Sequence, residues 1–280
     1  GEPSRVVTPL ARKIMLSKMS ETNRGKFTSY PFPLMRHATR DVLHAAKTKP
    51  MIHSLVEIDV TDARRRLREI RKVEGEAISF TGFVVACCAS AVDRNPGVQG
   101  YRGFGNKLVV FEDVDVSLPT ERTVDGWSQV IPIIIRQANK KSVRRIHREI
   151  REAQTAAVDA VGVYRGMRIF LMIPGVVRRL LFRFLDRMPH VMKERAGTMM
   201  ITSVGMFGSG AAWGVPVASH TLNVAIGGVV KRLESRGGEF SEREKVCLTI
   251  SFDHDIVDGG PAARYVHRRR QIMEKPTILE

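Results

Sequence analysis

The hydrophobic positions along the chain change their period repeatedly, and these changes predict alternating strands and helices. Alternating, β-branched runs predict strands at 55–60, 107–111, 114–118, 130–135, 198–204, 223–229 and 246–252. Helical spacing predicts helices at 36–46, 62–72, 79–91 and 139–161. We expect strands 107–111 and 114–118 to pair through an acidic turn, and Pro132 to mark an edge strand or a bulge. Strands that alternate with helices predict an α/β fold.

The two ends of the chain differ in composition. Residues 1–34 are polar, basic and interrupted by four prolines, which is typical of an arm or linker. Residues 35–280 are long enough to form one α/β domain with a large core. No run of eighteen apolar residues predicts a transmembrane helix, and early basic residues argue against a signal peptide.

One segment, about 163–197, breaks the regular pattern with an apolar stretch and an amphipathic helix. Its predicted apolar face comprises Val176, Val177, Leu180, Leu181, Phe184, Leu185 and Met188. Its predicted basic face comprises Arg178, Arg179, Arg183 and Arg187. Three roles remain open for residues 167–188: packing against core or another subunit, contact with an anionic membrane surface, or a wall for a long acyl group.

The net charge of +16 implies acidic partners, such as coenzyme A phosphates, an acidic carrier domain, anionic lipid or nucleic acid. The arginine clusters, which include 64–66, 144–145, 178–179 and 268–270, lack interleaved aromatic residues, so specific nucleic-acid binding is not expected. Three cysteines cannot form a complete set of disulfides, so we expect buried thiols and a cytoplasmic location, peripheral to a membrane if residues 167–188 bind one.

The strongest candidate for chemistry is the string Ser251-Phe252-Asp253-His254-Asp255-Ile256-Val257-Asp258-Gly259-Gly260. A strand is predicted before His254, and a helix that begins near Pro261 is predicted after it. Histidine can accept and return a proton near neutral pH. Asp258 can hold the loop or the imidazole in place. The spacing alone also suits an ordinary polar surface loop.

This string resembles the active-site motif of the 2-oxoacid dehydrogenase acyltransferases, in the chloramphenicol acetyltransferase-like superfamily. Further stretches resemble the same family in the same order. They are Met35-Arg36-His37-Ala38 with Lys47-Thr48-Lys49-Pro50, Val56-Glu57-Ile58-Asp59-Val60-Thr61, Gly126 to Ile134 with Ala138 to Ser142, and Ile201-Thr202-Ser203-Val204-Gly205-Met206-Phe207-Gly208. The resemblance runs from about Met35 to Glu274, interrupted at 163–197. It implies a two-layer sandwich on a mixed β-sheet.

The resemblance also implies roles for individual residues. His254 would be the general base for a thiol, and Thr202 would hold the hydroxyl that stabilises the oxyanion, with the adjacent Ser203 as the weaker candidate. Asp258, followed by Gly259, would orient the site through an arginine, for which Arg36 is the candidate. The implied assembly is a trimer with His254 of one chain near Thr202 of the next.

Two departures affect the substrate. The family's lipoyl-linked members usually carry Arg after the histidine, where this chain has Asp255, and no lipoyl domain is recognisable in the sequence. We therefore expect an acyltransferase that uses a coenzyme A thioester, with a lipoyl group on a separate domain or another carrier as the second partner. The alternative is a non-catalytic trimeric scaffold or membrane-surface assembly protein. Retention of His254, Thr202, Asp258 and Gly259 together favours the enzyme.

Other chemistries fit the sequence less well. Gly103-Phe104-Gly105 lacks the third glycine of a dinucleotide-binding loop, and neither a phosphate-binding Gly-Lys-Ser/Thr loop nor a Gly-x-Ser-x-Gly nucleophile motif occurs. No His, Cys or carboxylate set has metal-ligand spacing, so no metal is expected.

Overall fold

The computed structural model describes residues 27–30, 32, 34–124, 127–155, 170–204 and 210–280. The chain divides into two compact units, Gly1–Pro33 and Leu34–Glu280, and every helix and strand in the described residues belongs to the second. Most of the predicted arm, the end of the predicted helix at 139–161 and the glycines Gly205 and Gly208 lie outside the described residues.

A mixed sheet of six strands forms one layer, in the order β1-β8-β7-β6-β4-β5. The pairs β6–β7 and β4–β6 are parallel, and the other three are antiparallel. The strands are β1 Met51–Asp59, β4 Val116–Val124, β5 Trp127–Ile135, β6 Met199–Ser203, β7 Leu222–Arg236 and β8 Glu239–Asp253. Strand β5 lies at the edge of the sheet, as Pro132 predicts, because proline has no N–H to donate to a further strand.

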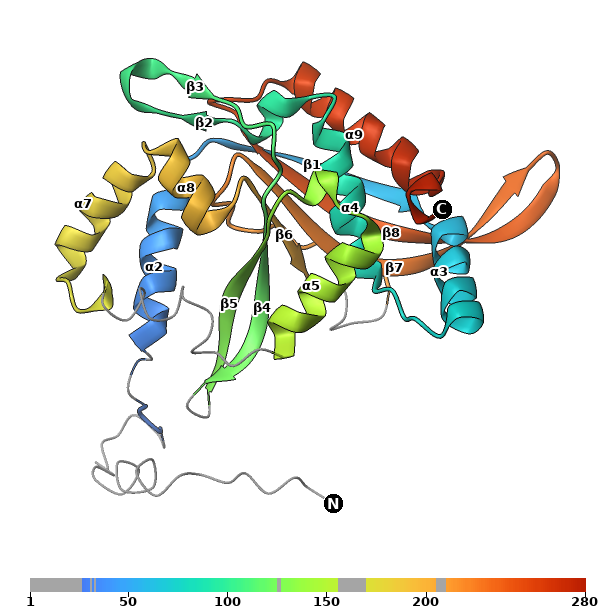
Figure 1. The fold of residues 1–280 in the computed structure, drawn as a ribbon, viewed down its shortest axis with the longest axis horizontal. Coiled ribbons are helices and arrows are strands. Elements are labelled where there is room, and N and C mark those ends of the chain that lie inside the picture. Colours follow the sequence, from blue (N-terminus) through green and yellow to red (C-terminus); the bar gives the residue numbers. More distant parts are fainter. Residues whose placement is uncertain (1–26, 31, 33, 125–126, 156–169, 205–209) are drawn as a thin grey trace. The chain divides into compact units, whose positions relative to one another are not determined.

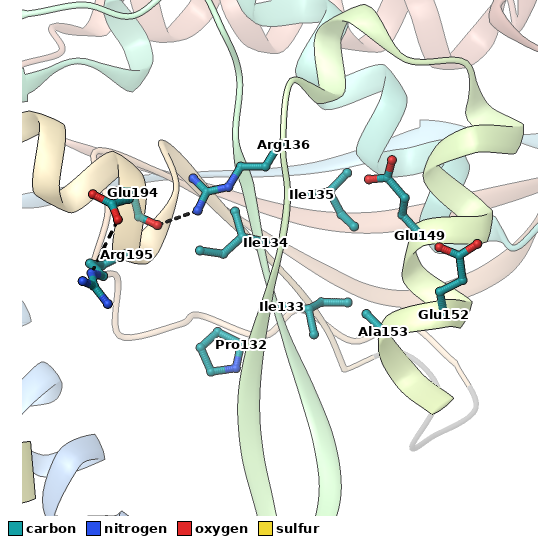
Figure 2. Close-up of a pocket in the computed structure, with 10 residues that line it drawn as sticks. All are labelled: Pro132, Ile133, Ile134, Ile135, Arg136, Glu149, Glu152, Ala153, Glu194 and Arg195. Atoms are coloured by element: carbon teal, nitrogen blue, oxygen red, sulfur yellow. Dashed lines mark hydrogen bonds and ion pairs between the residues drawn. The ribbon is translucent and has the colours of Figure 1, made fainter. Parts of the chain in front are cut away.

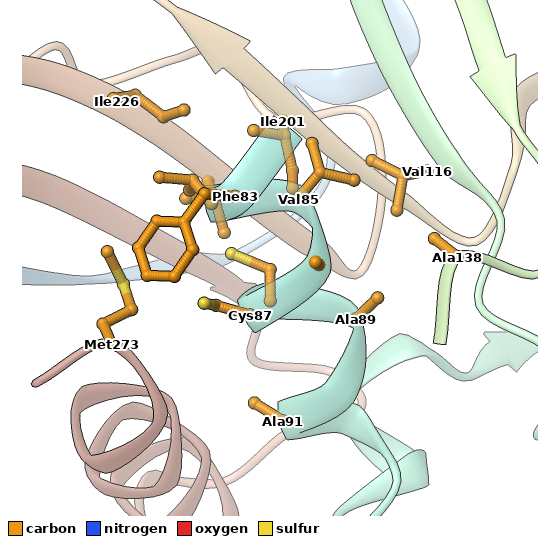
Figure 3. Close-up of a cluster of buried hydrophobic side chains, with 14 of the residues drawn as sticks. Phe83, Val85, Cys87, Ala89, Ala91, Val116, Ala138, Ile201, Ile226 and Met273 are labelled. Carbon is orange, nitrogen blue, oxygen red and sulfur yellow. The ribbon is translucent and has the colours of Figure 1, made fainter. Parts of the chain in front are cut away.

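Helices that pack on one another and on one face of the sheet form the second layer (Figure 1). They are α3 Thr61–Glu74, α4 Phe80–Val92, α5 Val143–Thr155 and α9 Gly259–Glu274. Helix α4 is buried on almost every side, and its N-terminus is capped by the Ser79 hydroxyl, which accepts the Gly82 N–H at 3.1 Å. Figure 3 shows its residues Phe83, Val85 and Cys87 among side chains of the sheet and α9. This confirms the α/β fold predicted from the pattern of elements and the two-layer sandwich on a mixed sheet that the resemblance implies.

The core also holds an arginine from the basic cluster 268–270. Arg269 lies on the buried stripe of α9 with Ala262, Tyr265 and Met273, and it is fully buried. None of its three guanidinium nitrogens has a hydrogen-bond partner in the described part of the chain. Its spacing on α9 therefore places Arg269 in the core despite its charge.

The predicted pairing of strands 107–111 and 114–118 is wrong. Residues Leu108–Val109 form a short strand, β3, which pairs with β2 (Tyr101–Arg102) as a separate hairpin around the 3-10 turn Phe104–Asn106. Strand β4 pairs with β5 and β6 instead. The acidic segment at Glu112 and Asp113 instead connects this hairpin to the main sheet. The Gln99 side-chain amide donates a hydrogen bond to the Phe111 carbonyl at 2.9 Å.

The segment predicted as an amphipathic insertion contains α7 Gly175–Leu185 and α8 Pro189–Ala196, and α7 packs beside α2 Leu34–Ala46 (Figure 1). The predicted faces of α7 are partly wrong. Arg178 belongs to the predicted basic face but is buried, whereas Val176, Val177, Leu180 and Phe184 of the predicted apolar face are exposed, which is compatible with one of the roles left open. Among the described residues, no helix is long and apolar enough to cross a membrane.

Candidate functional site

The junction between β8 and α9 holds His254 through its backbone. The His254 N–H donates to the Pro50 carbonyl at 2.8 Å, and the Val257 N–H donates to the Asp253 carbonyl at 2.9 Å. The buried Asp253 carboxylate accepts the Asp255 N–H at 3.2 Å and pairs with Lys49 at 3.3 Å. This turn thus presents a histidine from a backbone that is bonded to the start of β1.

The His254 side chain is 45% exposed, and its Nδ1 lies 3.7 Å from Oδ1 of Asp258, which is 87% exposed. This separation is too long for a hydrogen bond. The carboxylate would attract the ring mainly when the imidazole is protonated, and water would screen that attraction. Because Nδ1 faces Asp258, Nε2 is the nitrogen available to an incoming thiol.

Thr202 and Ser203 lie on opposite faces of β6, as alternation along a strand requires. Ile201 belongs to the buried cluster that packs under the helices, so Thr202 faces the other side of the sheet. Ser203 is level with the core residues Ile226 and Leu248, and therefore faces the helix layer. Both side chains are half-buried. Thr202 is thus the hydroxyl on the sheet face opposite the helix layer.

A pair of glycines holds the chain that follows β6 close to the sheet. Gly227 and Gly228 form the irregularity between Ile226 and Val229, and Gly228 donates its N–H to the Ala212 carbonyl at 3.1 Å. A Cβ on Gly227 would overlap the Ala212 carbonyl oxygen, and one on Gly228 would overlap the Gly210 carbonyl oxygen. Glycine is required here because two backbones pass at close range.

The strand registers place His254 and Thr202 far apart within one chain. Thr202 pairs with Ala225, and Ala225 pairs with Thr249, two strands away from β6. His254 lies five residues beyond Thr249 along the chain. At about 3.4 Å per residue along a strand and about 4.8 Å between strands, the separation is roughly 20 Å. One chain therefore brings His254 and Asp258 together but not His254 and Thr202.

The other two predicted site residues, Arg36 and Gly259, have no hydrogen bond or ion pair with His254 in the described part of the chain. Arg36 is exposed on α2, and no ion pair joins it to Asp258 in the described part of the chain. Gly259 is exposed in the first turn of α9, where a side chain would meet nothing within 4 Å. The folding of a single chain thus does not require glycine at 259.

Sequence reasoning did not single out a polar group that lies beside the junction. His220 is buried, its Nε2 lies 2.9 Å from the Ala196 carbonyl, and the next residue, Thr221, accepts the Asp253 N–H at 2.9 Å. Burial lowers the pKa of His220 to about 4, opposed by the bond to Ala196 and assisted by the nearby charge of Lys49. The hydrogen bond from Asp253 to Thr221 is what places His220 beside the junction. This bond exists only in the folded sheet, so the sequence could not reveal it.

His53 and Ser251 form another polar contact that strand alternation could have suggested. They pair across β1 and β8, and His53 Nδ1 lies 2.8 Å from Ser251 Oγ. Ser251 is fully buried, so its hydroxyl is not accessible as a nucleophile. No group of three or more His, Cys, Asp or Glu side chains in the described residues has an arrangement that could hold a metal ion.

A groove of about 550 Å³ runs along the free edge of β5, between that strand, α5 and α8 (Figure 2). Its floor is apolar, formed by Pro132 to Ile135, and its rim carries Arg136, Glu149, Glu152, Glu194 and Arg195. A smaller groove of about 320 Å³ adjoins it around Asp115 and Lys193. Neither is lined by His254, Thr202 or Asp258, so neither encloses the predicted site residues.

Comparison with known proteins gives a consistent result. The sequence model of one family, the 2-oxoacid dehydrogenases acyltransferase (catalytic domain), matches residues 24–160 and 183–280. A dihydrolipoyllysine-residue acetyltransferase component of the pyruvate dehydrogenase complex from Staphylococcus aureus is 22% identical over 269 residues. That match covers 92% of this chain and 54% of the relative, so the chain spans about half the length of the curated relatives it matches.

Solved structures show the same fold. A probable dihydrolipoamide acetyltransferase from Listeria monocytogenes 4b F2365 superposes with a TM-score of 0.65 at 21% identity, over 89% of this chain and 95% of that one. A truncated catalytic core of the 2-oxoacid dehydrogenase multienzyme complex from Thermoplasma acidophilum gives 0.64 at 18% identity, over 90% and 100%. The cubic core of the pyruvate dehydrogenase multienzyme complex gives 0.67 at 15% identity, over 94% and 98%.

The family match covers most of the chain and includes β6, β8 and the junction that carries His254. It is interrupted at 161–182, which overlaps the predicted insertion at about 163–197. With a mixed sheet, a single helical layer and the Asp-His-x-x-x-Asp-Gly string at the end of β8, the chain belongs to the 2-oxoacid dehydrogenase acyltransferase family.

Proposed function

We propose that this protein transfers an acyl group between thioester and thiol carriers, with His254 as general base and Thr202 as oxyanion donor. The observation that carries the proposal is the position of the two residues. In a single chain His254 is exposed and Thr202 is half-buried, and the two are roughly 20 Å apart by strand register. A complete site therefore needs a second copy of the chain, as the family resemblance implies for a trimer.

The reaction follows from these two side chains. His254 Nε2 accepts the proton of the incoming thiol, and the thiolate attacks the thioester carbonyl carbon. The carbonyl oxygen becomes an oxyanion, to which the Thr202 hydroxyl donates a hydrogen bond. The bond from carbon to the original sulfur then breaks, and His254 returns its proton to the departing thiolate. Asp258, at 3.7 Å from Nδ1, favours the imidazolium that exists between these steps.

The carrier chemistry is part of the proposal. A coenzyme A thioester suits the net charge of +16, since its phosphates are anionic. The second thiol would belong either to a lipoyl group on a separate domain or to a different carrier. Asp255 places a negative charge beside His254, so we expect poor transfer to a carrier that presents anionic groups at that position.

Mixed oligomers test the shared site directly. His254→Ala and Thr202→Val should each abolish transfer from acetyl-coenzyme A to dihydrolipoamide when purified alone. When the two variants are co-expressed and assemble together, about one interface in four should combine an intact His254 with an intact Thr202. Activity should then reappear. The double variant His254→Ala/Thr202→Val, mixed with wild type at the same ratio, controls for simple dilution.

Absence of recovery in oligomers proven to be mixed would contradict a site shared between chains. A panel of acyl-coenzyme A thioesters of increasing length, offered to wild type and His254→Ala, tests the chemistry itself. Release of thiol that does not depend on His254 would contradict its role as base. No transfer from any thioester, with the oligomer intact, would favour the scaffold alternative.

A peripheral contact of residues 167–188 with a membrane would be independent of this chemistry.

A further inference from the structure

A buried ion pair links helix α7 to α2. Arg178 donates from Nε to the Asp41 carboxylate on α2 at 2.7 Å, and from Nη1 to the carbonyls of Ile173 at 2.8 Å and Leu171 at 3.2 Å. The two charged side chains are only 10% and 8% exposed. Because this pair fixes the rotation of α7, one face of the helix is held toward α2 and the opposite face toward solvent.

The outward face is apolar. Val176 is 64% exposed, Val177 51%, Leu180 63% and Phe184 54%. At about 100° per residue, these four side chains fall within a sector of about 100° around the helix axis. Met172, just before the helix, is 85% exposed. We call these five residues the α7 patch.

The patch continues onto a second element. The ring of Phe104, in the turn of the β2–β3 hairpin, lies 5.2 Å from the ring of Phe184, and Phe104 is itself 54% exposed. Isolated exposed apolar residues are common, but a continuous group of large ones on a protein surface marks a contact with a partner.

Arginines border the α7 patch. Arg179, Arg183 and Arg187 are exposed, and none forms an ion pair with a carboxylate in the described part of the chain. On the helix, Arg179 and Arg183 fall on one flank of the apolar sector. Unpaired positive charges beside an exposed apolar stripe favour an anionic apolar partner over a neutral one.

A second copy of the same face is a poor occupant. In a two-fold contact the patch would meet itself, which would bring the arginines of the two copies together without carboxylates between them. An anionic lipid surface satisfies both features at once, because the acyl region accepts the apolar side chains and the phosphates accept the guanidinium groups.

We propose that the α7 patch binds the surface of an anionic lipid bilayer, with α7 parallel to the membrane plane. With eleven residues, α7 is about 16 Å long, which is too short to cross a bilayer. Much of α7 lies in residues 161–182, outside the match to the family, so the proposed contact is an addition to the shared fold.

Vesicle flotation tests the proposal with the full chain. Wild type should float with vesicles of phosphatidylcholine containing 30% phosphatidylglycerol, but not with phosphatidylcholine alone, and high salt should weaken the binding. Leu180→Ser/Phe184→Ser and Arg179→Gln/Arg183→Gln should each reduce the apparent affinity by roughly tenfold or more. His254→Ala should float like wild type, which separates this contact from acyl transfer.

Two matched control variants distinguish binding through the α7 patch from nonspecific hydrophobic adsorption and from an effect of net charge. Leu233→Ser/Phe240→Ser removes two exposed apolar residues from the β7–β8 hairpin, and Arg65→Gln/Arg71→Gln removes two exposed charges from α3. Both should bind vesicles like wild type. Equal loss in the controls, or no binding to anionic vesicles, would overturn the proposal. So would a change of oligomer size in Leu180→Ser/Phe184→Ser without a change in lipid binding, which would identify a protein interface.

Discussion

The junction that carries His254 and the helix α7 both follow an apolar stretch, but they are held in different ways. At the junction, the backbone of His254 bonds to Pro50 and the turn bonds to Asp253, while the imidazole stays 45% exposed. At α7, a buried side-chain pair, Arg178 with Asp41, links the helix to α2. A backbone turn can be inferred from local sequence, whereas a side-chain pair between residues 137 positions apart cannot.

The largest effect we expect concerns the junction. His254→Ala removes the proposed base and should lower acyl transfer by roughly 10² to 10⁴. Because only backbone groups of His254 hold the turn, the variant should keep the wild-type circular dichroism spectrum and oligomer size. Steady-state kinetics and size-exclusion chromatography check both statements. A variant that loses its oligomer together with its activity would show that the side chain has a structural role.

The next effect concerns α7. Asp41→Ala leaves the buried Arg178 guanidinium without its carboxylate and should lower the free energy of unfolding by about 3–5 kcal/mol. Urea denaturation measures this value. Glu69→Ala is the control, since its pair with Arg66 is about half exposed on both sides and should contribute less than about 1 kcal/mol. Equal losses in the two variants would mean that Arg178 does not anchor α7.

The buried imidazole of His220, beside the junction, predicts that the free energy of unfolding depends on pH. The pKa of His220 is about 4 in the folded chain and about 6.5 when unfolded, so the unfolded chain binds the proton first as the pH falls. The contribution of neutral His220 is complete above about pH 6.5 and is lost as the pH falls toward 4, a change of about 3 kcal/mol.

Urea midpoints measured between pH 4 and pH 7 test this slope. In His220→Gln the decline over that range should be shallower than in wild type. In His44→Gln, which changes an exposed histidine on α2, it should be unchanged. A slope in His220→Gln equal to that of wild type would exclude His220 as its source.

Most of the fold could be predicted from the period of apolar positions, since a buried strand or helix requires it. The strand before His254, the helix after it and the edge position of the strand with Pro132 are all found in the structure. The hairpin of β2 and β3 was missed because the choice of partner for a two-residue strand depends on contacts far away in the chain.

Charge misled the prediction at two arginines. Arg178 and Arg269 belong to sequence clusters of basic residues, and both are buried. Arg178 has Asp41 and two carbonyls. Arg269 follows the apolar spacing of α9, and its guanidinium nitrogens have no hydrogen-bond partner in the described residues. Residue type alone could not reveal either environment, because a buried charge depends on the groups that surround it in the fold.

At the candidate site, too, the sequence suggests which residues matter, but only the fold shows how far apart they lie. Motif order makes His254, Asp258 and Thr202 the candidates, and alternation along β6 puts Thr202 and Ser203 on opposite faces of the sheet. The separation of His254 and Thr202 within one chain follows only from the strand order of the sheet. Sequence position gives no measure of that distance, so whether one chain can form the site depends on the register.

The smallest effect we expect returns to the junction and asks how much Asp258 contributes through charge. Its carboxylate is 87% exposed and 3.7 Å from the imidazole, so water screens their attraction. Asp258→Asn should therefore lower acyl transfer only a few-fold at low salt, and high salt should reduce the difference from wild type. A loss as large as that of His254→Ala, unchanged by salt, would instead mean that the assembled protein buries Asp258 against a cation. Arg36 is the candidate, because it is exposed in the single chain, and Arg36→Gln should then reproduce the loss.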